Sequence, residues 1–252
     1  MTRVRFDVSC WKSLNNSLGT GGADGSIDSM TTRCAANRTR GFTRKELLVV
    51  IGTVVLLAAL LLSALANAKR KYQRIWCTNY LKQIGIAFRL WEGDHGDKYP
   101  MQVALTNSET MKLMASGNAY VFWQTMSNVI STPFILHCPA DTNTIAATNF
   151  ATGFSDANIS YFFSLDAFES YPQMILDGDD NLAVDGVRVK PGILNLWTNN
   201  IAWTKERHRF NSNIGLADGS VQQTTIAGLN YAVGSSVSGV PTNNAPNRWV
   251  MP

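Results

Sequence analysis

The stretch that decides the fold is RGFTRKELLVVIGTVVLLAALLLSALANAKRK, residues 40–71. Residues 47–68 of this stretch form 22 consecutive positions without a charged side chain. At a rise of about 1.5 Å per residue, a helix of that length crosses a hydrocarbon core about 30 Å thick. Core helices of soluble proteins rarely continue so far without a polar face. Residues 42–68 are therefore predicted to form a transmembrane helix in a lipid bilayer.

A cleaved signal peptide is the alternative for this segment, because SALANA (residues 63–68) offers small residues for cleavage after Ala66 or Ala68. The sequence that follows argues against removal. Apolar side chains recur there three and four residues apart, on one face of a helix: Cys77, Leu81, Ile84, Phe88 and Trp91. Residues 69–92 are predicted to continue the same helix into solvent, up to the glycines at 93 and 96.

Composition sets broad limits on the protein. The chain has 252 residues, 45% hydrophobic and 16% charged, which suits one domain of moderate size plus a segment of different character. A formal net charge of +4 gives no indication of nucleic-acid binding. The spacing of the four cysteines fits no metal-binding motif: Cys10, Cys34, Cys77 and Cys138.

The start of the apolar stretch resembles a known signal. Gly41-Phe42-Thr43, followed by Glu46 and a Leu/Val/Ile run, resembles the N-terminus of type IV prepilins and type II secretion pseudopilins. The resemblance implies cleavage by a prepilin peptidase between Gly41 and Phe42, N-methylation of Phe42, and an assembly role for Glu46. A carboxylate at bilayer depth costs a few kcal/mol unless it is paired, and the N-terminal amine of a neighbouring subunit is an available partner. The alternative is that Glu46 is a solvated acid in the first turn of the helix, where the helix dipole favours it.

Residues 1–41 are then a leader peptide. Met30 is a candidate start, because translation from it leaves the short basic leader MTTRCAANRTRG. Arg44 and Lys45 stand where members of the family usually carry apolar residues, and they could pair with Glu46 within the chain. These two cations keep open a second interpretation, in which the signal inserts the protein but the protein does not polymerise.

Further segments resemble a pseudopilin-like group of planctomycetes and verrucomicrobia. They are RIWCTNYLKQIGIAFRLWEGDHGDKYP (residues 74–100), ILHCPAD (residues 135–141) and HRFNSNIGLADGSV, in which nine residues separate His208 from Asp218-Gly219. Neither a Ser-His-Asp context nor zinc-like spacing surrounds the histidines. We therefore expect His208 to close a hydrogen-bonded corner, and Asp218 with Gly219 to form the turn of a hairpin.

The remainder, residues 93–234, is predicted to be a globular α+β domain: a small antiparallel β-sheet packed on the soluble half of the long helix. FILHC (residues 134–138) and ISYFFSL (residues 159–165) look like short strands, and NAYVFWQTM (residues 118–126) suits a strand or a short helix. Residues 235–252, with three prolines and several asparagines, are predicted to form an irregular tail.

Two further features leave alternatives open. LDGDDNLAVDG (residues 176–186) contains Asp177, Asp179, Asp180 and Asp185, which suit a calcium site or a solvated acidic turn. Cleavage after Gly41 would leave Cys77 and Cys138 as the cysteines of the mature chain. In a periplasmic domain they could form one disulfide, and the alternative is two separate buried thiols.

Together these features predict a structural, non-enzymatic protein. It would be a single-pass protein of the inner membrane with a periplasmic C-terminal domain, acting as a pseudopilin-like subunit of a type II secretion or type IV pilus-like system. Its expected partners are the prepilin peptidase, other pseudopilin subunits, secretion-system components and the bilayer. The alternative is a membrane-anchored extracytoplasmic binding module that uses the prepilin signal without polymerising. A hydrolase would need a convergent polar site, which the sequence does not suggest.

Overall fold

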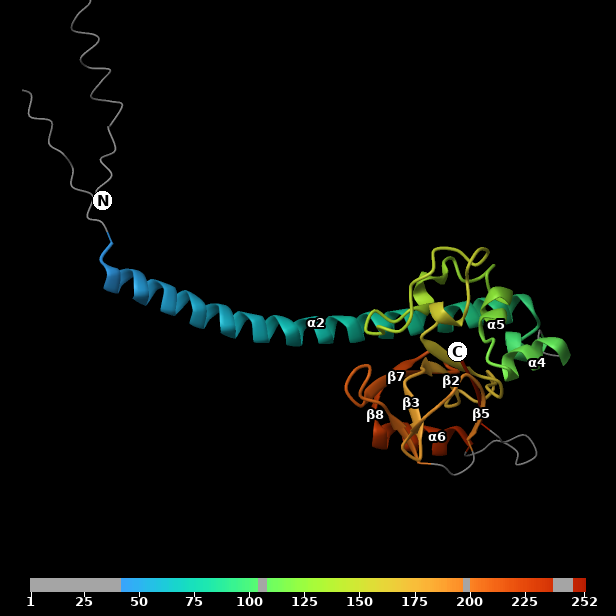
Figure 1. The fold of residues 1–252 in the computed structure, drawn as a ribbon. Coiled ribbons are helices and arrows are strands. Elements are labelled where there is room, and N and C mark those ends of the chain that lie inside the picture. The colour runs from blue at the N-terminus through green and yellow to red at the C-terminus, as the bar shows by residue number, and fades with distance from the viewer. Residues whose placement is uncertain (1–41, 104–107, 197–199, 238–246) are drawn as a thin grey trace, which may run out of the picture. The chain divides into compact units, whose positions relative to one another are not determined.

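The computed structural model describes residues 42–103, 108–196, 200–237 and 247–252. Residues 1–41, the predicted leader with Gly41, Cys10, Cys34 and the candidate start at Met30, therefore lie outside the described residues. The chain divides into two compact units, one ending at Ala58 and the other comprising Ala59–Pro252. Helix α2, Arg44–Asp94, passes through both (Figure 1).

Within the second unit, one face of α2 is buried in the protein from Cys77 onward. The buried side chains recur at the predicted helical spacing: Cys77, Tyr80, Leu81, Ile84, Ala87 and Phe88. The helix ends where Gly96 and Asp97 adopt φ values of 66° and 58°, which lie in the left-handed region that stops a helix. The predicted continuation of the helix beyond the apolar segment is confirmed.

Two antiparallel sheets form the centre of this unit. A six-stranded sheet has the order β5-β9-β1-β2-β7-β8, and a three-stranded sheet has the order β4-β3-β6. The strands are β1 Tyr161–Ser164, β2 Ile175–Asp179, β3 Leu182–Val184, β4 Val187–Arg188, β5 Gly192–Leu196, β6 Ile201–Trp203, β7 Asn211–Leu216, β8 Val221–Thr225 and β9 Asn247–Met251. The remaining helices are α3 Pro100–Val103, α4 Ser108–Ala115, α5 Tyr120–Thr125 and α6 Ile226–Val237, with 3-10 turns at Pro133–Leu136 and Asp156–Asn158.

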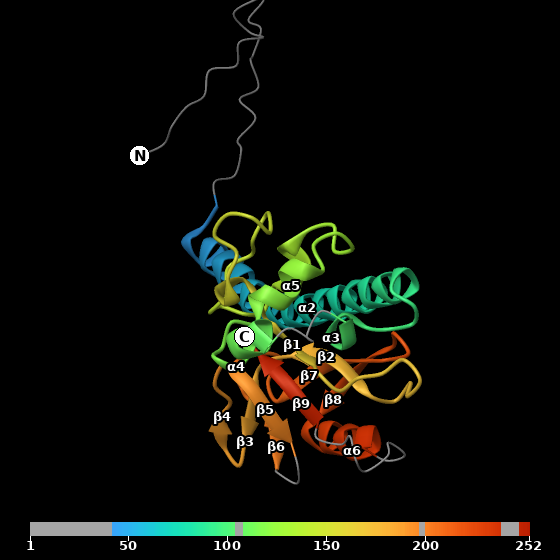
Figure 2. The ribbon, with the colours of Figure 1, turned by 90° about the vertical axis from the view of Figure 1, so that its right-hand side faces the viewer.

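The large sheet separates two hydrophobic cores, and α2 and α6 lie on its opposite faces (Figure 2). Successive side chains of β1 alternate between the cores, because a strand projects them to opposite faces. Tyr161 and Phe163 join the core that contains the α2 face, whereas Phe162 stacks on Trp249 in the core that contains α6, with ring centroids 4.2 Å apart. The domain thus has three layers, held by aromatic packing on both sides of the sheet.

The predicted fold class is confirmed: a long apolar N-terminal helix and a small antiparallel sheet domain of mixed α+β type. Two local predictions were wrong. FILHC is mostly a 3-10 turn, because Pro133 and the Thr132 side chain, which accepts from the Phe134 backbone N–H, start a helical turn. The predicted irregular tail contains β9, an inner strand of the large sheet between β5 and β1.

Candidate functional site

The proposed processing site lies immediately before α2. Phe42 is 78% exposed, and Thr43 and Glu46 form a capping box at the first turn. The Thr43 backbone N–H and hydroxyl donate to Glu46 Oε2 at 2.7 and 2.9 Å, and the Glu46 N–H donates to Thr43 Oγ1 at 3.3 Å. Such reciprocal bonds satisfy N–H groups that a helix start leaves without partners. Because the helix begins after Phe42, cleavage before Phe42 would remove none of its described turns.

The same helix is the candidate membrane segment. Among the described residues, α2 is the one helix long and apolar enough to cross a membrane, with a mean hydropathy of 2.9 in its most apolar window. Its large side chains from Leu47 to Leu65 are exposed rather than packed on protein. Side chains of this kind need another apolar environment, which a bilayer supplies. The segment is consistent with a single-pass membrane protein.

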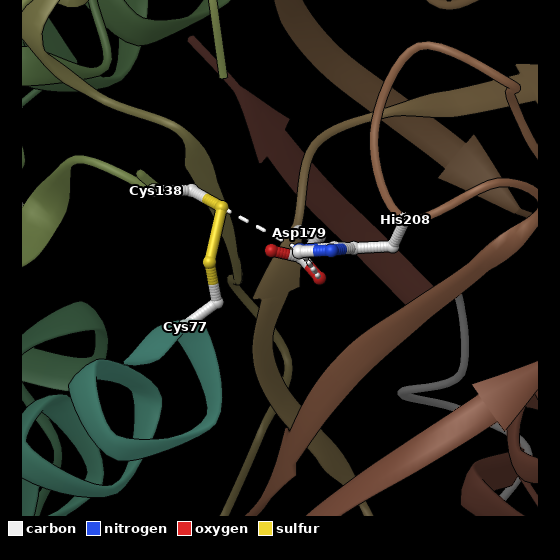
Figure 3. Close-up of side chains that lie close together, drawn as sticks. All are labelled: Cys77, Cys138, Asp179 and His208. Carbon is white, nitrogen blue, oxygen red and sulfur yellow. Dashed lines mark hydrogen bonds and ion pairs between the residues drawn. A yellow bond between two sulfur atoms is a disulfide. The ribbon is translucent and has the colours of Figure 1, made fainter. Parts of the chain in front are cut away.

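A second cluster of side chains brings together residues from motifs that lie far apart in the sequence. Cys77 of α2 forms a disulfide with Cys138, with their Cα atoms 5.4 Å apart. His208 lies in the loop between β6 and β7, beside the disulfide and Asp179 (Figure 3). Its Nε2 is 3.5 Å from Cys138 Sγ and 4.0 Å from Asp179 Oδ2. Of the two alternatives for the cysteines, the structure contains the disulfide.

The His208 side chain is only 2% exposed. Burial lowers the pKa of His208 below its ordinary value, Asp179 opposes this shift, and Arg207 and Arg74 add to it. A neutral imidazole therefore sits against the disulfide. With φ values of 48°, 51° and 61°, His208, Arg209 and Phe210 all adopt the left-handed conformation. His208 thus occupies a tight corner of the chain.

Asp218 and Gly219 lie at the other end of β7 from His208, so the two halves of the C-terminal signature do not meet. Asp218 Oδ1 accepts from the Ser220 N–H at 2.8 Å, Gly219 donates to the Leu216 carbonyl at 2.8 Å, and Gly219 has a φ of 81°. Asp218 is a turn residue of the β7–β8 hairpin. The separation of nine residues spans strand β7 with its two flanking turns.

The four acids of the calcium prediction are divided among different roles. Asp177 and Asp179 lie in β2 and are fully buried, so they are not part of a solvated turn. Asp180 pairs with Arg207. Asp185 occupies the turn between β3 and β4 with a φ of 49°. Calcium binding by this set stays a prediction.

Arg207 and Asp141 are buried charges that the sequence analysis missed. Arg207 is 3% exposed, lies 3.4 Å from Asp141 and donates to the Ser160 carbonyl at 2.9 Å. Burial raises the pKa of Asp141, but Arg207 and hydrogen bonds from Asn143 and Ser160 bring it below its ordinary value. Asp141 is therefore ionised against Arg207. Both residues gave a signal in the sequence, since Asp141 is the last residue of the quoted motif ILHCPAD and Arg207 directly precedes His208.

One group of possible metal ligands emerges from the described residues: Cys77, Cys138, Asp179 and His208, whose ligand atoms lie within 4.8 Å of one another. The chemistry of this set limits its use. Zinc requires thiolates, and both sulfurs are joined to each other. The oxidised cluster offers only Asp179 and His208, which is fewer ligands than a zinc site uses. We therefore describe it as a covalent and hydrogen-bonded junction between α2 and the sheet.

Comparison with known proteins adds no relative to this description: no family model matches the chain, nor does any curated protein or solved structure.

Proposed function

We propose that this protein is a structural, pseudopilin-like subunit that a prepilin peptidase processes between Gly41 and Phe42. It would enter the inner membrane through the apolar half of α2, place its sheet domain in the periplasm and assemble with like subunits of a type II secretion or type IV pilus-like system. One observation carries the proposal: a 51-residue helix that begins two residues after Phe42 exposes its apolar first half and buries one face of its second half against a sheet.

The geometry at Glu46 supports an assembly role, and its bonds to Thr43 account for an acid in the first turn of the helix. Both described bonds to its carboxylate use Oε2, so the second oxygen remains for a positively charged partner. A neighbouring subunit's N-terminal amine at Phe42 supplies such a charge. No ion pair joins Glu46 to Arg44 or Lys45 among the described contacts. The carboxylate can therefore cap its own helix and pair with a neighbour at the same time.

The first experiment determines the mature N-terminus by mass spectrometry, in cells with and without the prepilin peptidase. N-methylated Phe42 that depends on the peptidase supports the proposal. An intact leader, or a terminus near Lys69, contradicts it.

The second experiment separates capping from assembly. Glu46→Gln retains an oxygen that can accept the Thr43 bonds, because Gln also completes a capping box, but it removes the charge. Thr43→Ala removes the capping hydroxyl and retains the charge. If Glu46 pairs with an amine, crosslinked ladders of processed protein disappear in Glu46→Gln and persist in Thr43→Ala. Ladders that survive Glu46→Gln, or that are absent from processed wild-type protein, favour the membrane-anchored binding module instead.

A further inference from the structure

A cavity of about 610 Å³ lies between the start of the soluble half of α2 and the loop before β7. Its lining is strongly basic: Arg70, Lys71 and Arg74 come from the helix, and Lys205, Arg207 and Arg209 from the loop. All of these residues belong to the second unit of the chain.

Most of the cations that line this cavity have no ion-pair partner among the described residues, although Asp179 opposes the lowering of the pKa of Arg74 by burial. The one acid among the described lining residues, Glu206, pairs with Arg188, and Arg207 pairs with Asp141 and Asp180. Among the described residues, no ion pair engages the five other cations: Arg70, Lys71, Arg74, Lys205 and Arg209. Like charges gathered at one place repel one another, and an anion between them removes that cost.

Two local features indicate a ligand rather than an ordinary basic surface. Arg74 Nε is buried and has no hydrogen-bond partner in the described part of the chain, and a buried donor without a partner is costly. The loop contributes Arg209 from the middle of three consecutive left-handed residues, at φ values of 48°, 51° and 61°. Backbone of this kind is strained for residues other than glycine and is concentrated at ligand clamps and other functional sites.

The position along α2 identifies the source of the anion. Arg70 and Arg74 follow Ala68, the last residue of the apolar run, by two and six positions. At about 1.5 Å per residue they lie roughly 3 and 9 Å beyond the hydrocarbon boundary. The headgroup layer occupies about the first 5–8 Å there, since a bilayer of 40–45 Å has a core of about 30 Å. The Arg70 backbone therefore lies within this layer and the Arg74 backbone just beyond its outer edge, from which a long basic side chain can reach a headgroup phosphate.

Exposed aromatic side chains lie close in sequence to the basic ones. Tyr72, Trp76 and Phe210 are 58%, 37% and 48% exposed, and the rings of Tyr72 and Trp76 pack edge to face. Exposed aromatic residues beside lysines and arginines are typical of the membrane–water interface.

We propose that this cavity binds the phosphate of an anionic phospholipid headgroup in the leaflet from which the sheet domain projects. Arg74 forms its inner wall, and Lys71, Lys205 and Arg209 hold the phosphate from its open side. This goes beyond the assembly role, and binding by a single subunit is sufficient for it.

The test uses full-length processed protein in nonionic detergent, titrated with dioctanoyl phosphatidylglycerol, dioctanoyl phosphatidylcholine or inorganic phosphate. Binding is followed by native mass spectrometry and by the thermal midpoint of the domain. The variant Lys71→Gln/Lys205→Gln/Arg209→Gln removes three exposed cations of the cavity. The matched control, Lys82→Gln/Lys98→Gln/Lys112→Gln, makes the same change of charge at exposed positions outside it.

We expect phosphatidylglycerol to bind more tightly than either other ligand, with at least tenfold weaker binding in the cavity variant and less than a twofold change in the control. Equal losses of phosphatidylglycerol binding in the two variants would show that general surface charge causes the binding, and would overturn the assignment to the cavity. Equal binding of phosphatidylcholine would overturn the role of the anionic headgroup. Inorganic phosphate binding as tightly as phosphatidylglycerol would establish a free-anion site and overturn the assignment to lipid. Each of these results leaves the test of Glu46 in assembly unaffected.

Discussion

Removal of the disulfide between Cys77 and Cys138 provides the sharpest test of how α2 is joined to the sheet domain. The bond closes a loop with a sequence separation of 61 residues. In the chain-entropy model, a loop of that length lowers the entropy of the unfolded chain by about 14 cal/mol/K, which corresponds to about 4 kcal/mol at 25 °C. Both side chains are fully buried, so each Cys→Ala substitution also leaves a small void worth roughly 1 kcal/mol.

The pattern across three variants matters more than any single value. Cys77→Ala breaks the whole bond, and so does Cys138→Ala. Each should therefore lower the free energy of unfolding by about 5 kcal/mol. The double variant should lose only about 1 kcal/mol more than either single variant, because no second bond remains to break. Two independent thiols would instead give small losses that add.

Chemical denaturation of the processed protein in detergent, followed by tryptophan fluorescence, measures these values. Each sample is unfolded with and without dithiothreitol, after full equilibration in the denaturant. The reductant should lower the midpoint of the wild-type protein toward that of the single variants and leave all three variants unchanged. Additive losses, or a wild-type midpoint that does not respond to the reductant, would refute the reasoning.

Three further predictions concern the sheet and the segments packed against it. Gly215→Ala should destabilise the domain by about 3 kcal/mol, because the new Cβ would lie 1.9 Å from Asp177 Oδ1. Gly234→Ala, whose new Cβ would meet no atom of the described residues within 4 Å, should stabilise helix α6 by about 1 kcal/mol, and denaturation measures both changes. Burial and repulsion from a neighbouring carboxylate raise the pKa of Asp177 well above its ordinary value. The folded state therefore keeps a proton that the unfolded state releases above about pH 4, so stability should fall by up to about 1.4 kcal/mol per pH unit until the raised pKa is reached. Asp177→Asn should flatten this slope in melting experiments between pH 5 and 8, and an unchanged slope would contradict the assignment. Arg207→Gln should cost about 3–5 kcal/mol by leaving buried carboxylates without a partner, whereas Arg188→Gln, at an exposed ion pair, should cost less than about 1 kcal/mol.

The parts of the fold that the sequence predicts are those governed by local periodicity. The three- and four-residue spacing of apolar side chains after Cys77 predicted which face of α2 is buried. Strand β1 was recognisable from its aromatic and β-forming residues. Strand β9 was not, because NRWVM is short and follows a polar segment, and it becomes a strand through pairing with β5 and β1. Pairing over such distances leaves little trace in a single sequence.

The candidate site likewise has features that the sequence predicts and features that it does not. The pairing of Cys77 with Cys138 was one of two open alternatives, since a count of cysteines gives a possible pair but no distance. The corner at His208 followed from the absence of a catalytic context. The ion pair of Arg207 with Asp141 was missed, because 66 positions separate the two residues and each looks like an ordinary surface charge in sequence. Once the pair is buried, removal of either charge leaves the other uncompensated and destabilises the fold, and sequence alone does not report burial.

The position of the disulfide suits it to hold α2 on the sheet domain under load. Cys77 is the first buried residue of α2, so the bond lies at the end of the buried helix face that is nearer the apolar segment. If α2 were to separate from the sheet, the separation would begin at this end, where few buried contacts hold the helix. A covalent bond placed there blocks the first step of that opening. Both a polymerising subunit and a membrane-anchored module would transmit load from the bilayer to the domain through α2. The junction of Cys77, Cys138, His208 and Asp179 therefore strengthens the connection at the point where either function would stress it first.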